Sequence, residues 1–131
     1  MLNSCRLGLV VWIIVLPGCS VPFLGGYGEN GKSKEEFAVY VEKVFQFQNR
    51  LTSEVMMLME SGEGLNQFDD LLVAEQNMHK ICAPLNEYAA RENDGLSIGL
   101  LLRRRVEKSA VACEKAAKQV DIEIKKLGAV S

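Results

Sequence analysis

Apolar residues between positions 37 and 127 recur at alternating steps of three and four, the spacing that places side chains on one face of an α-helix. Three such stretches are separated by short segments rich in Gly, Asn, Asp and Ser. No run of alternating apolar and polar residues, the pattern typical of β-strands, competes with them. The pattern therefore predicts an all-α domain over residues 33–131, with helices at about 34–60, 66–92 and 97–127.

The first predicted helix begins at a capping box. Ser33 and Glu36 have the spacing at which each side chain can bond the other residue's backbone N–H group. The segment Ser-Gly-Glu-Gly at 61–64 ends the helix. Its apolar stripe, in which one position is polar, consists of Phe37, Val41, Val44, Gln48, Leu51, Val55 and Leu58.

The second predicted helix contains a proline within its apolar region. We expect Asn66 to cap this helix, with Asp69 and Asp70 placed favourably near the positive end of the helix dipole. Pro84 lacks a backbone N–H and disfavours helical geometry at the preceding residue, so a kink is expected near Pro84. The stripe consists of Phe68, Leu71, Glu75, Met78, Cys82, Leu85 and Ala89.

The third predicted helix carries the longest stripe. Ser97 is its expected N-cap, and Lys125 and Lys126 lie in its last turn, where cations suit the helix dipole. The stripe consists of Ile98, Leu101, Leu102, Val106, Ala110, Cys113, Ala117, Val120, Ile124 and Leu127. Because short loops force neighbouring helices to run antiparallel, the predicted fold is a small antiparallel three-helix bundle.

Residues 1–18 have the organisation of a cleaved signal peptide. Arg6 precedes an uncharged, largely apolar stretch from Leu7 to Leu16, which is too short to cross a hydrocarbon core that requires about 20 residues. The alternative is a buried N-terminal helix of a cytosolic protein. Pro17 and Gly18 interrupt the stretch where such a helix would continue, so the signal peptide is the favoured interpretation.

The sequence Leu16-Pro17-Gly18-Cys19 resembles the lipobox of bacterial lipoproteins, although Ala, Ser or Thr is commoner at the place of the proline. The resemblance implies cleavage before Cys19, a diacylglyceryl thioether on its thiol and often a further acyl chain such as palmitate on its amine. In such lipoproteins, an Asp at the position of Ser20 would favour the inner membrane. By the same resemblance, Ser20 implies the outer membrane, facing the periplasm. Residues 19–32 would then be a lipidated N-terminus and a flexible Gly-rich spacer.

Two cysteines of the expected mature domain, Cys82 and Cys113, lie on apolar stripes. Cys82 lies about 13 residues before the turn near 95–96 and Cys113 about 17 after it, so their levels in an antiparallel pair differ by about one helical turn. A kink at Pro84 and a tilted helix can absorb this difference. In an oxidising periplasm the pair is expected to form a disulfide, with two free buried thiols as the alternative.

Residues 26–33 match the P-loop pattern G-x-x-x-x-G-K-[ST]. In a nucleotide-binding loop, Gly26 and Gly31 would let backbone amides wrap phosphate oxygens, Lys32 would reach the terminal phosphates and Ser33 would bind magnesium. That geometry requires a buried strand before the loop, and only residues 19–25 precede it in the expected mature chain. A tether is therefore the favoured interpretation, and nucleotide binding is the alternative.

Three successive arginines, Arg103, Arg104 and Arg105, are the candidate interaction residues of the third helix. They belong to a segment, 97–131, that has eight basic and four acidic residues, whereas 29–96 has six basic and thirteen acidic residues. We interpret the arginines as a solvated face of a basic helix that complements the acidic ones. Contact with anionic lipid headgroups or an acidic protein is the functional alternative.

Sulfur and imidazole side chains occur in the first two helices without the spacing of a metal site. Met59 and Met78 are expected roughly 20 Å apart along the bundle, so the methionines are interpreted as flexible core residues. His79 is the only histidine, and no cysteine or aspartate is placed to form a catalytic triad with it. The sequence therefore predicts no enzymatic activity, no metal and no cofactor.

These observations favour a membrane-anchored lipoprotein that acts as a non-catalytic binding or scaffold module of the cell envelope. The expected partners are the membrane, through lipid on Cys19, and an envelope protein or cell-wall component. The compartment excludes nucleic acid. The alternatives are an inhibitor or immunity-type lipoprotein and a nucleotide-binding enzyme that uses Gly26–Ser33.

Overall fold

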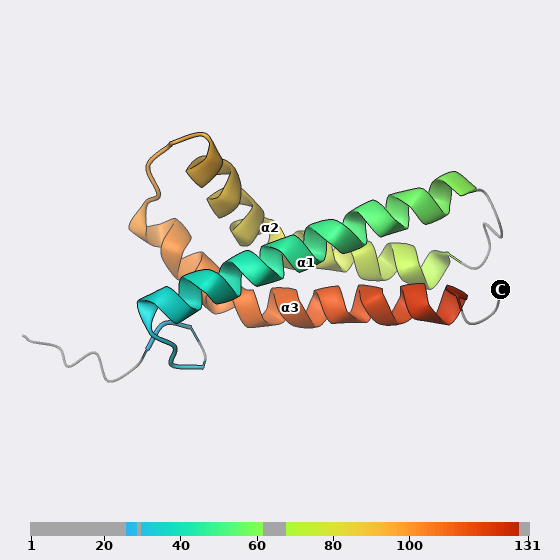
Figure 1. Ribbon diagram of the computed structural model, residues 1–131, viewed down its shortest axis with the longest axis horizontal. Coiled ribbons are helices and arrows are strands. Elements are labelled where there is room, and N and C mark those ends of the chain that lie inside the picture. The colour runs from blue at the N-terminus through green and yellow to red at the C-terminus, as the bar shows by residue number, and fades with distance from the viewer. Residues whose placement is uncertain (1–25, 29, 62–67, 129–131) are drawn as a thin grey trace, which may run out of the picture.

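A computed structural model describes residues 26–28, 30–61 and 68–128, which form three helices (Figure 1): α1 (Lys34–Ser61), α2 (Asp69–Asn93) and α3 (Leu100–Gly128). In Figure 1, α2 runs back along α1, and α3 runs forward again. The described residues contain no β-strand beyond one isolated bridge, so the predicted all-α bundle is confirmed. The expected signal peptide (1–18), Cys19 and the expected cap Asn66 lie outside the described residues.

The N-terminus of α1 is fixed by the predicted capping box. The backbone N–H of Ser33 donates to the Glu36 carboxylate at 2.9 Å, and the backbone N–H of Glu36 donates to Ser33 Oγ at 3.2 Å. These bonds satisfy two donors that the first turn of a helix leaves without intrahelical partners. The expected stripe faces the core: Phe37, Val41, Val44, Gln48, Leu51 and Val55 are buried, and Leu58 is partly buried.

Pro84 lies inside α2, and Figure 1 shows α2 bent partway along its length. The part after the bend, drawn in gold, turns away from the other two helices. Proline removes one backbone hydrogen bond and its ring clashes with the carbonyl of the preceding turn, which is the usual cause of a kink. At the start of the helix, Phe68 occupies the N-cap position, makes no side-chain capping bond and is buried.

The start of α3 differs from the prediction. The helix begins at Leu100, and Ser97 is not its cap: the Ser97 carbonyl instead accepts a hydrogen bond from Arg91 at 3.4 Å. Leu101, expected on the core stripe, is 78% exposed, because its neighbour Leu102 occupies the core position and successive residues of a helix point about 100° apart. Ile98 packs against the core and Leu102 is buried as predicted, so Leu101 is the stripe position that the prediction misplaced.

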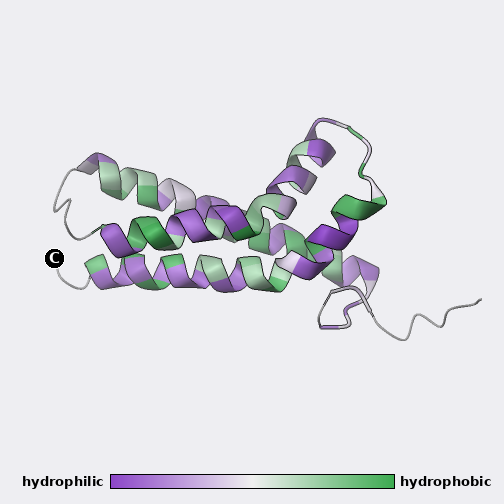
Figure 2. Ribbon diagram, turned by 180° about the vertical axis from the view of Figure 1, so that it is seen from behind, coloured by the Kyte–Doolittle hydropathy of each residue, from purple (hydrophilic) through white to green (hydrophobic). Residues whose placement is uncertain are grey.

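A disulfide between Cys82 of α2 and Cys113 of α3 lies in the middle of the core. Both residues are fully buried, and their Cα atoms are 4.8 Å apart, so the predicted pair is confirmed. Figure 2 shows hydrophobic and hydrophilic residues alternating in bands along the helices, as expected for helices that bury one face. The other largest fully buried side chains are Gln48, Leu51, Val55, Leu71, Met78, Leu85 and Val120.

One hydrogen bond between side chains joins α1 to α3. The Tyr40 hydroxyl donates to the Glu114 carboxylate at 2.6 Å, and Lys118 donates to the same carboxylate at 2.5 Å. The bond from Lys118 and then the bond from Tyr40 lower the pKa of Glu114 below its ordinary value. Both bonds therefore favour the ionised form of Glu114.

Reduction of the disulfide is expected to destabilise the domain. The sequence separation of 31 residues predicts a contribution of about 3.5 kcal/mol to the free energy of unfolding in the chain-entropy model. Urea unfolding followed by circular dichroism, with and without dithiothreitol, measures this contribution. A double variant, Cys82→Ala with Cys113→Ala, is the control and should not respond to the reductant; equal unfolding midpoints for the oxidised and reduced protein would contradict the expectation.

The Tyr40–Glu114 bond should make stability depend on pH. Because the pKa of Glu114 is lowered by folding, its contribution is present above the unfolded pKa of about 4.3 and is lost as the pH falls through the folded value. Tyr40→Phe should cost about 1 kcal/mol at pH 7, and this difference should shrink in acid. Unfolding curves at several pH values test this, with Tyr88→Phe as control because no hydrogen bond joins the Tyr88 hydroxyl to the described residues. A cost that is unchanged in acid would refute the assignment.

Candidate functional site

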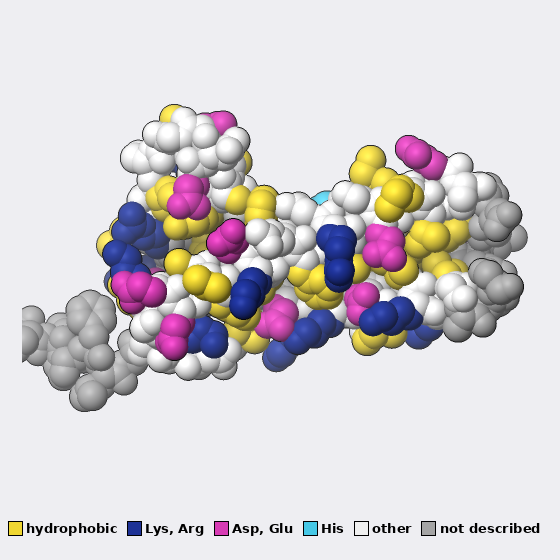
Figure 3. All heavy atoms as spheres, in the orientation of Figure 1, with side chains coloured by type: hydrophobic (Ala, Val, Ile, Leu, Met, Phe, Trp, Pro, Cys, Tyr) yellow, Lys and Arg dark blue, Asp and Glu magenta, His cyan; other side chains and the backbone are white. Residues whose placement is uncertain are grey.

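A groove lies between α1 and the part of α2 that follows Pro84. Its volume is about 990 Å³, and the first turns of α3 close one side of it. Figure 3 shows hydrophobic side chains exposed between the lobe formed by the end of α2 and the body of the bundle. In a straight helix, the end of α2 would continue alongside α1. The bend separates the two helices, so the groove is a consequence of the proline.

The groove has an apolar floor and a polar rim. Its floor includes the buried side chains of Val41, Leu85 and Val106, and its walls include the half-buried rings of Phe45 and Tyr88. The rim carries Glu42, Gln46, Asn49, Glu92 and Asn93. The described residues that line it include no histidine, cysteine or serine. Such a surface binds by apolar contact and directed hydrogen bonds, the usual composition of a ligand site.

Gln48 of α1 and Asn86 of α2 form a polar pair at the base of this groove. Gln48 is 1% exposed, and its Nε2 donates to Asn86 Oδ1, while Asn86 itself lines the groove. Gln48 Oε1 accepts no hydrogen bond from the described residues. Gln48 is not among the residues that line the groove, so this buried oxygen is closed off from it. In the sequence, Gln48 is visible as the one polar residue of the first stripe.

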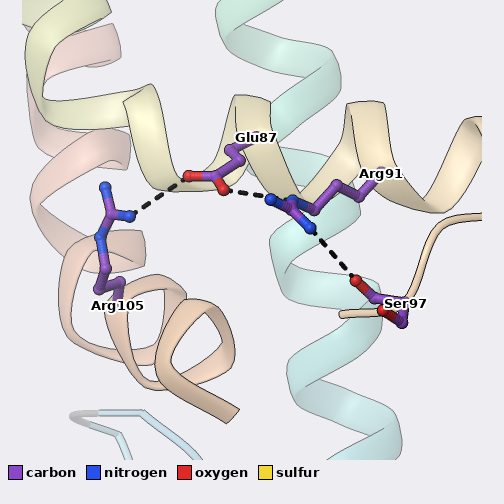
Figure 4. A network of polar contacts seen from close by, with 4 residues as sticks. All are labelled: Glu87, Arg91, Ser97 and Arg105. Carbon is purple, nitrogen blue, oxygen red and sulfur yellow. Dashed lines mark hydrogen bonds and ion pairs between the residues drawn. The ribbon is translucent and has the colours of Figure 1, made fainter. Parts of the chain in front are cut away.

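A network around Glu87 joins the end of α2 to α3, and none of its residues lines the groove (Figure 4). The Glu87 carboxylate pairs with Arg91 at 3.2 Å and with Arg105 of α3 at 3.3 Å. Arg91 also donates to the carbonyl of Ser97 in the connection between α2 and α3. All these charged side chains are well exposed, so each pair contributes little to stability. The network positions the end of α2 relative to α3.

The three candidate arginines therefore have different surroundings. Arg105 faces Glu87 of α2, whereas Arg103 lines the groove. All three are exposed, and no ion pair joins Arg103 or Arg104 to another residue in the described part of the chain. Arg103 and Arg104, like Lys108 and Lys115, are thus exposed cations of this helix for which the described residues provide no ion pair.

The described residues of the P-loop pattern, 26–28 and 30–33, include a tight turn. The Tyr27 N–H donates to the Lys32 carbonyl at 2.7 Å, and the Lys32 N–H donates to the Tyr27 carbonyl at 3.2 Å. The Ser33 hydroxyl accepts a bond from Glu36, and the pKa of Glu36 is lowered by its bonds with the Ser33 backbone and hydroxyl. Gly26 is required because a Cβ atom there would overlap the backbone of Gly31. The glycines serve the turn, and the backbone N–H groups of Tyr27, Gly31, Lys32 and Ser33 donate hydrogen bonds within the chain.

The same turn packs against α1. The rings of Tyr27 and Phe37 lie 6.2 Å apart, and Lys32 Nζ lies 5.3 Å from the centre of the Tyr40 ring. Gly28 has φ +72°, and a Cβ atom there would meet the Phe37 ring at 2.7 Å. Residues 26–32, which we expected to belong to a flexible spacer, are instead folded onto the helix in the part that the structure describes. The spacer prediction did not include this aromatic packing.

The sulfur and imidazole side chains do not meet. Met78 is fully buried, but Met56, Met57 and Met59 are exposed, so the interpretation of the methionines as core residues is wrong for these three. They fall outside the stripe of α1, which continues from Val55 to Leu58. His79 is exposed and lies 3.5 Å from Glu75. No group of three or more His, Cys, Asp or Glu that could hold a metal ion occurs among the described residues.

Sequence reasoning missed the groove. Pro84 predicted a kink in α2. Whether a kink opens a groove depends on how the end of α2 is then placed relative to α1 and α3, and the spacing of apolar residues does not contain that information. The available signal was the coincidence of Pro84, Gln48 and Asn86 at one level of two adjacent helices.

In the described part of the chain, no helix is both long and apolar enough to span a bilayer. Comparisons with models of protein families, with curated proteins and with solved structures find no match for this chain.

Proposed function

We propose that this protein is a lipid-anchored module of the cell envelope that binds an apolar segment of a partner protein in the groove between α1 and α2. The groove is the observation that carries the proposal. It is open, is lined by three helices and has a volume of about 990 Å³. That volume lies at the upper end of the range of about 300–1,000 Å³ that is common for ligand sites. An open apolar groove of this kind suits the side chains of a helix or an extended segment.

The polar residues of the groove support a polypeptide as its ligand. Gln46, Asn49 and Asn86 offer amide donors and acceptors in the groove. A polypeptide brings backbone and side-chain N–H donors together with apolar side chains. The lining residues provide no nucleophile with an adjacent base, which supports binding without catalysis.

The proposed anchor rests on the resemblance of Leu16-Pro17-Gly18-Cys19 to a lipobox. Each buried methylene contributes roughly 0.8 kcal/mol to membrane binding, so two or three acyl chains hold a protein stably on a bilayer. The disulfide is compatible with the oxidising compartment that this anchor implies. Under this proposal, the groove is presented to partners at the membrane surface.

Replacement of the lipidated cysteine tests the anchor. Cys19→Ser should abolish the incorporation of radiolabelled palmitate and move the protein out of the membrane fraction, because the thiol that carries the lipid is absent. Cys5→Ser, which lies in the segment expected to be removed, is the matched control and should leave labelling unchanged. Labelling that persists in Cys19→Ser would show that the anchor is elsewhere.

Photocrosslinking in intact cells tests the groove. A photoreactive amino acid at Ala38 of α1 or Ala90 of α2, on opposite walls, should capture the same partner protein. Ala112 of α3 is exposed as well but does not line the groove, so it is the matched control. The additional substitution Ala89→Trp should fill the groove and abolish capture from Ala38. Equal capture from Ala112, or capture that survives Ala89→Trp, would mean that the partner binds another surface.

A further inference from the structure

We propose that the end of the bundle at the start of α3 is a second membrane contact, in which exposed leucines and arginines dock on a phospholipid surface with anionic headgroups. The residues of this contact surface are Leu96, Leu100, Leu101, Arg103 and Arg104. The proposal takes its geometry from the proposed lipid anchor on Cys19. It goes beyond that anchor because it assigns a lipid-binding role to the folded domain itself.

Three leucines within six residues are exposed at this end. Leu96 is 56% exposed, Leu100 67% and Leu101 78%, and they lie on the connection to α3 and in its first turn. The connection is held in one conformation, because the Leu96 N–H donates to the Arg91 carbonyl at 2.8 Å and the Ser97 carbonyl accepts from Arg91. The leucines are therefore presented on an ordered surface. Apolar side chains presented in this way insert shallowly into a membrane interface.

Positive charge accompanies these leucines. The segment 96–108 contains Arg103, Arg104, Arg105 and Lys108 against a single acidic residue, Glu107. Arg105 is engaged by Glu87, whereas no ion pair within the described residues neutralises Arg103 or Arg104. The first turn of α3 has no acidic side chain, so the partial positive charge of the helix N-terminus adds to that of the arginines. Guanidinium groups and helix amides are donors that suit phosphate.

The position of this surface points to a membrane as its partner. In Figure 1 the start of α1, the connection between α2 and α3, and the start of α3 all lie at the left end of the molecule. Figure 3 shows Lys and Arg side chains next to hydrophobic ones at that end. Cys19 precedes Gly26 by seven residues, which span at most about 25 Å when fully extended. A lipid on Cys19 would thus hold the leucines and arginines close to the lipid headgroups. The same anchor would not bring an acidic protein closer to them, so it favours a membrane as the partner.

A tryptophan at the exposed tip of the surface reports the contact. The chain has one tryptophan, Trp12, in the segment that cleavage before Cys19 would remove, so Leu101→Trp gives the processed protein a single fluorophore. The full-length, lipid-modified protein is reconstituted into vesicles of equal parts phosphatidylglycerol and phosphatidylcholine that carry brominated acyl chains. We expect a blue-shifted emission and quenching of about twofold, as for a side chain in the membrane interface. The protein without the substitution is the blank for any residual Trp12.

Val73→Trp is the matched control, because Val73 is 67% exposed and lies in the early part of α2, at the other end of the bundle. Its fluorescence should be unaffected by the brominated lipid. Arg103→Gln with Arg104→Gln should lower the quenching of Leu101→Trp in anionic vesicles to the level found in pure phosphatidylcholine. Lys80→Gln with Lys115→Gln removes the same charge from exposed positions elsewhere and should leave the quenching unchanged.

The outcomes separate this contact from the anchor. The proposed contact would be overturned if Leu101→Trp and Val73→Trp were quenched equally, or if Leu101→Trp were not quenched in membrane-bound protein. In either case, palmitate on Cys19 would still support the anchor. If Cys19 carries no palmitate, the anchor fails. Quenching of Leu101→Trp but not of Val73→Trp by added anionic vesicles would then still support the contact.

Discussion

The close approach of α2 and α3 at the Cys82–Cys113 disulfide is the constraint on which the rest of the structure depends. Two helices with Cα atoms 4.8 Å apart leave no space for large side chains between them at that level. The sequence meets this requirement with small residues on the buried face of α3, where Ala110, Ala116 and Ala117 flank Cys113. The α2–α3 pair is thus the rigid part of the bundle, and α1 lies across it.

The disulfide also determines where α2 can bend. Cys82 precedes Pro84 by two residues, so the covalent link holds the helix against α3 directly before the break. Beyond the break, Arg105 of α3 pairs with Glu87 of α2, and the Gln48–Asn86 hydrogen bond joins α2 to α1 two residues after Pro84. The groove lies beside this bond, between α1 and the end of α2.

The sequence predicted those features that depend on local periodicity. Burial of the α1 stripe from Phe37 to Val55, the capping box at Ser33 and the Cys82–Cys113 pair follow from spacing along a helix, because side chains three and four residues apart share a face. The buried face at the start of α3 was not predicted correctly. Both Leu101 and Leu102 fit the periodic pattern, but only Leu102 is buried in the folded protein.

Other differences between prediction and structure arise from residue types that were interpreted without regard to their positions. Glycine-rich composition indicated a flexible spacer, but Tyr27 supplied a ring that packs against Phe37 and orders the turn. Met56 and Met57 were assigned to the core by residue type, although their positions lie off the stripe and leave them exposed. In both cases residue composition was weaker evidence than position relative to a neighbouring helix. To predict the groove, one would also need the placement of α2 relative to α1 after the break at Pro84.

The folded turn at 26–32 changes what an anchor on Cys19 would do. A flexible chain from Cys19 to Lys32 could extend about 45 Å and would allow the domain any orientation above the bilayer. Tyr27 packs on Phe37 and Lys32 on Tyr40, so the contacts with α1 begin at Tyr27; the seven residues from Cys19 to Gly26 can span at most about 25 Å. Under the proposed anchor, this shorter tether favours the end that carries Leu101 and Arg104 facing the headgroups. The groove, which Arg103 lines at that same end, would then receive partner segments close to the membrane surface.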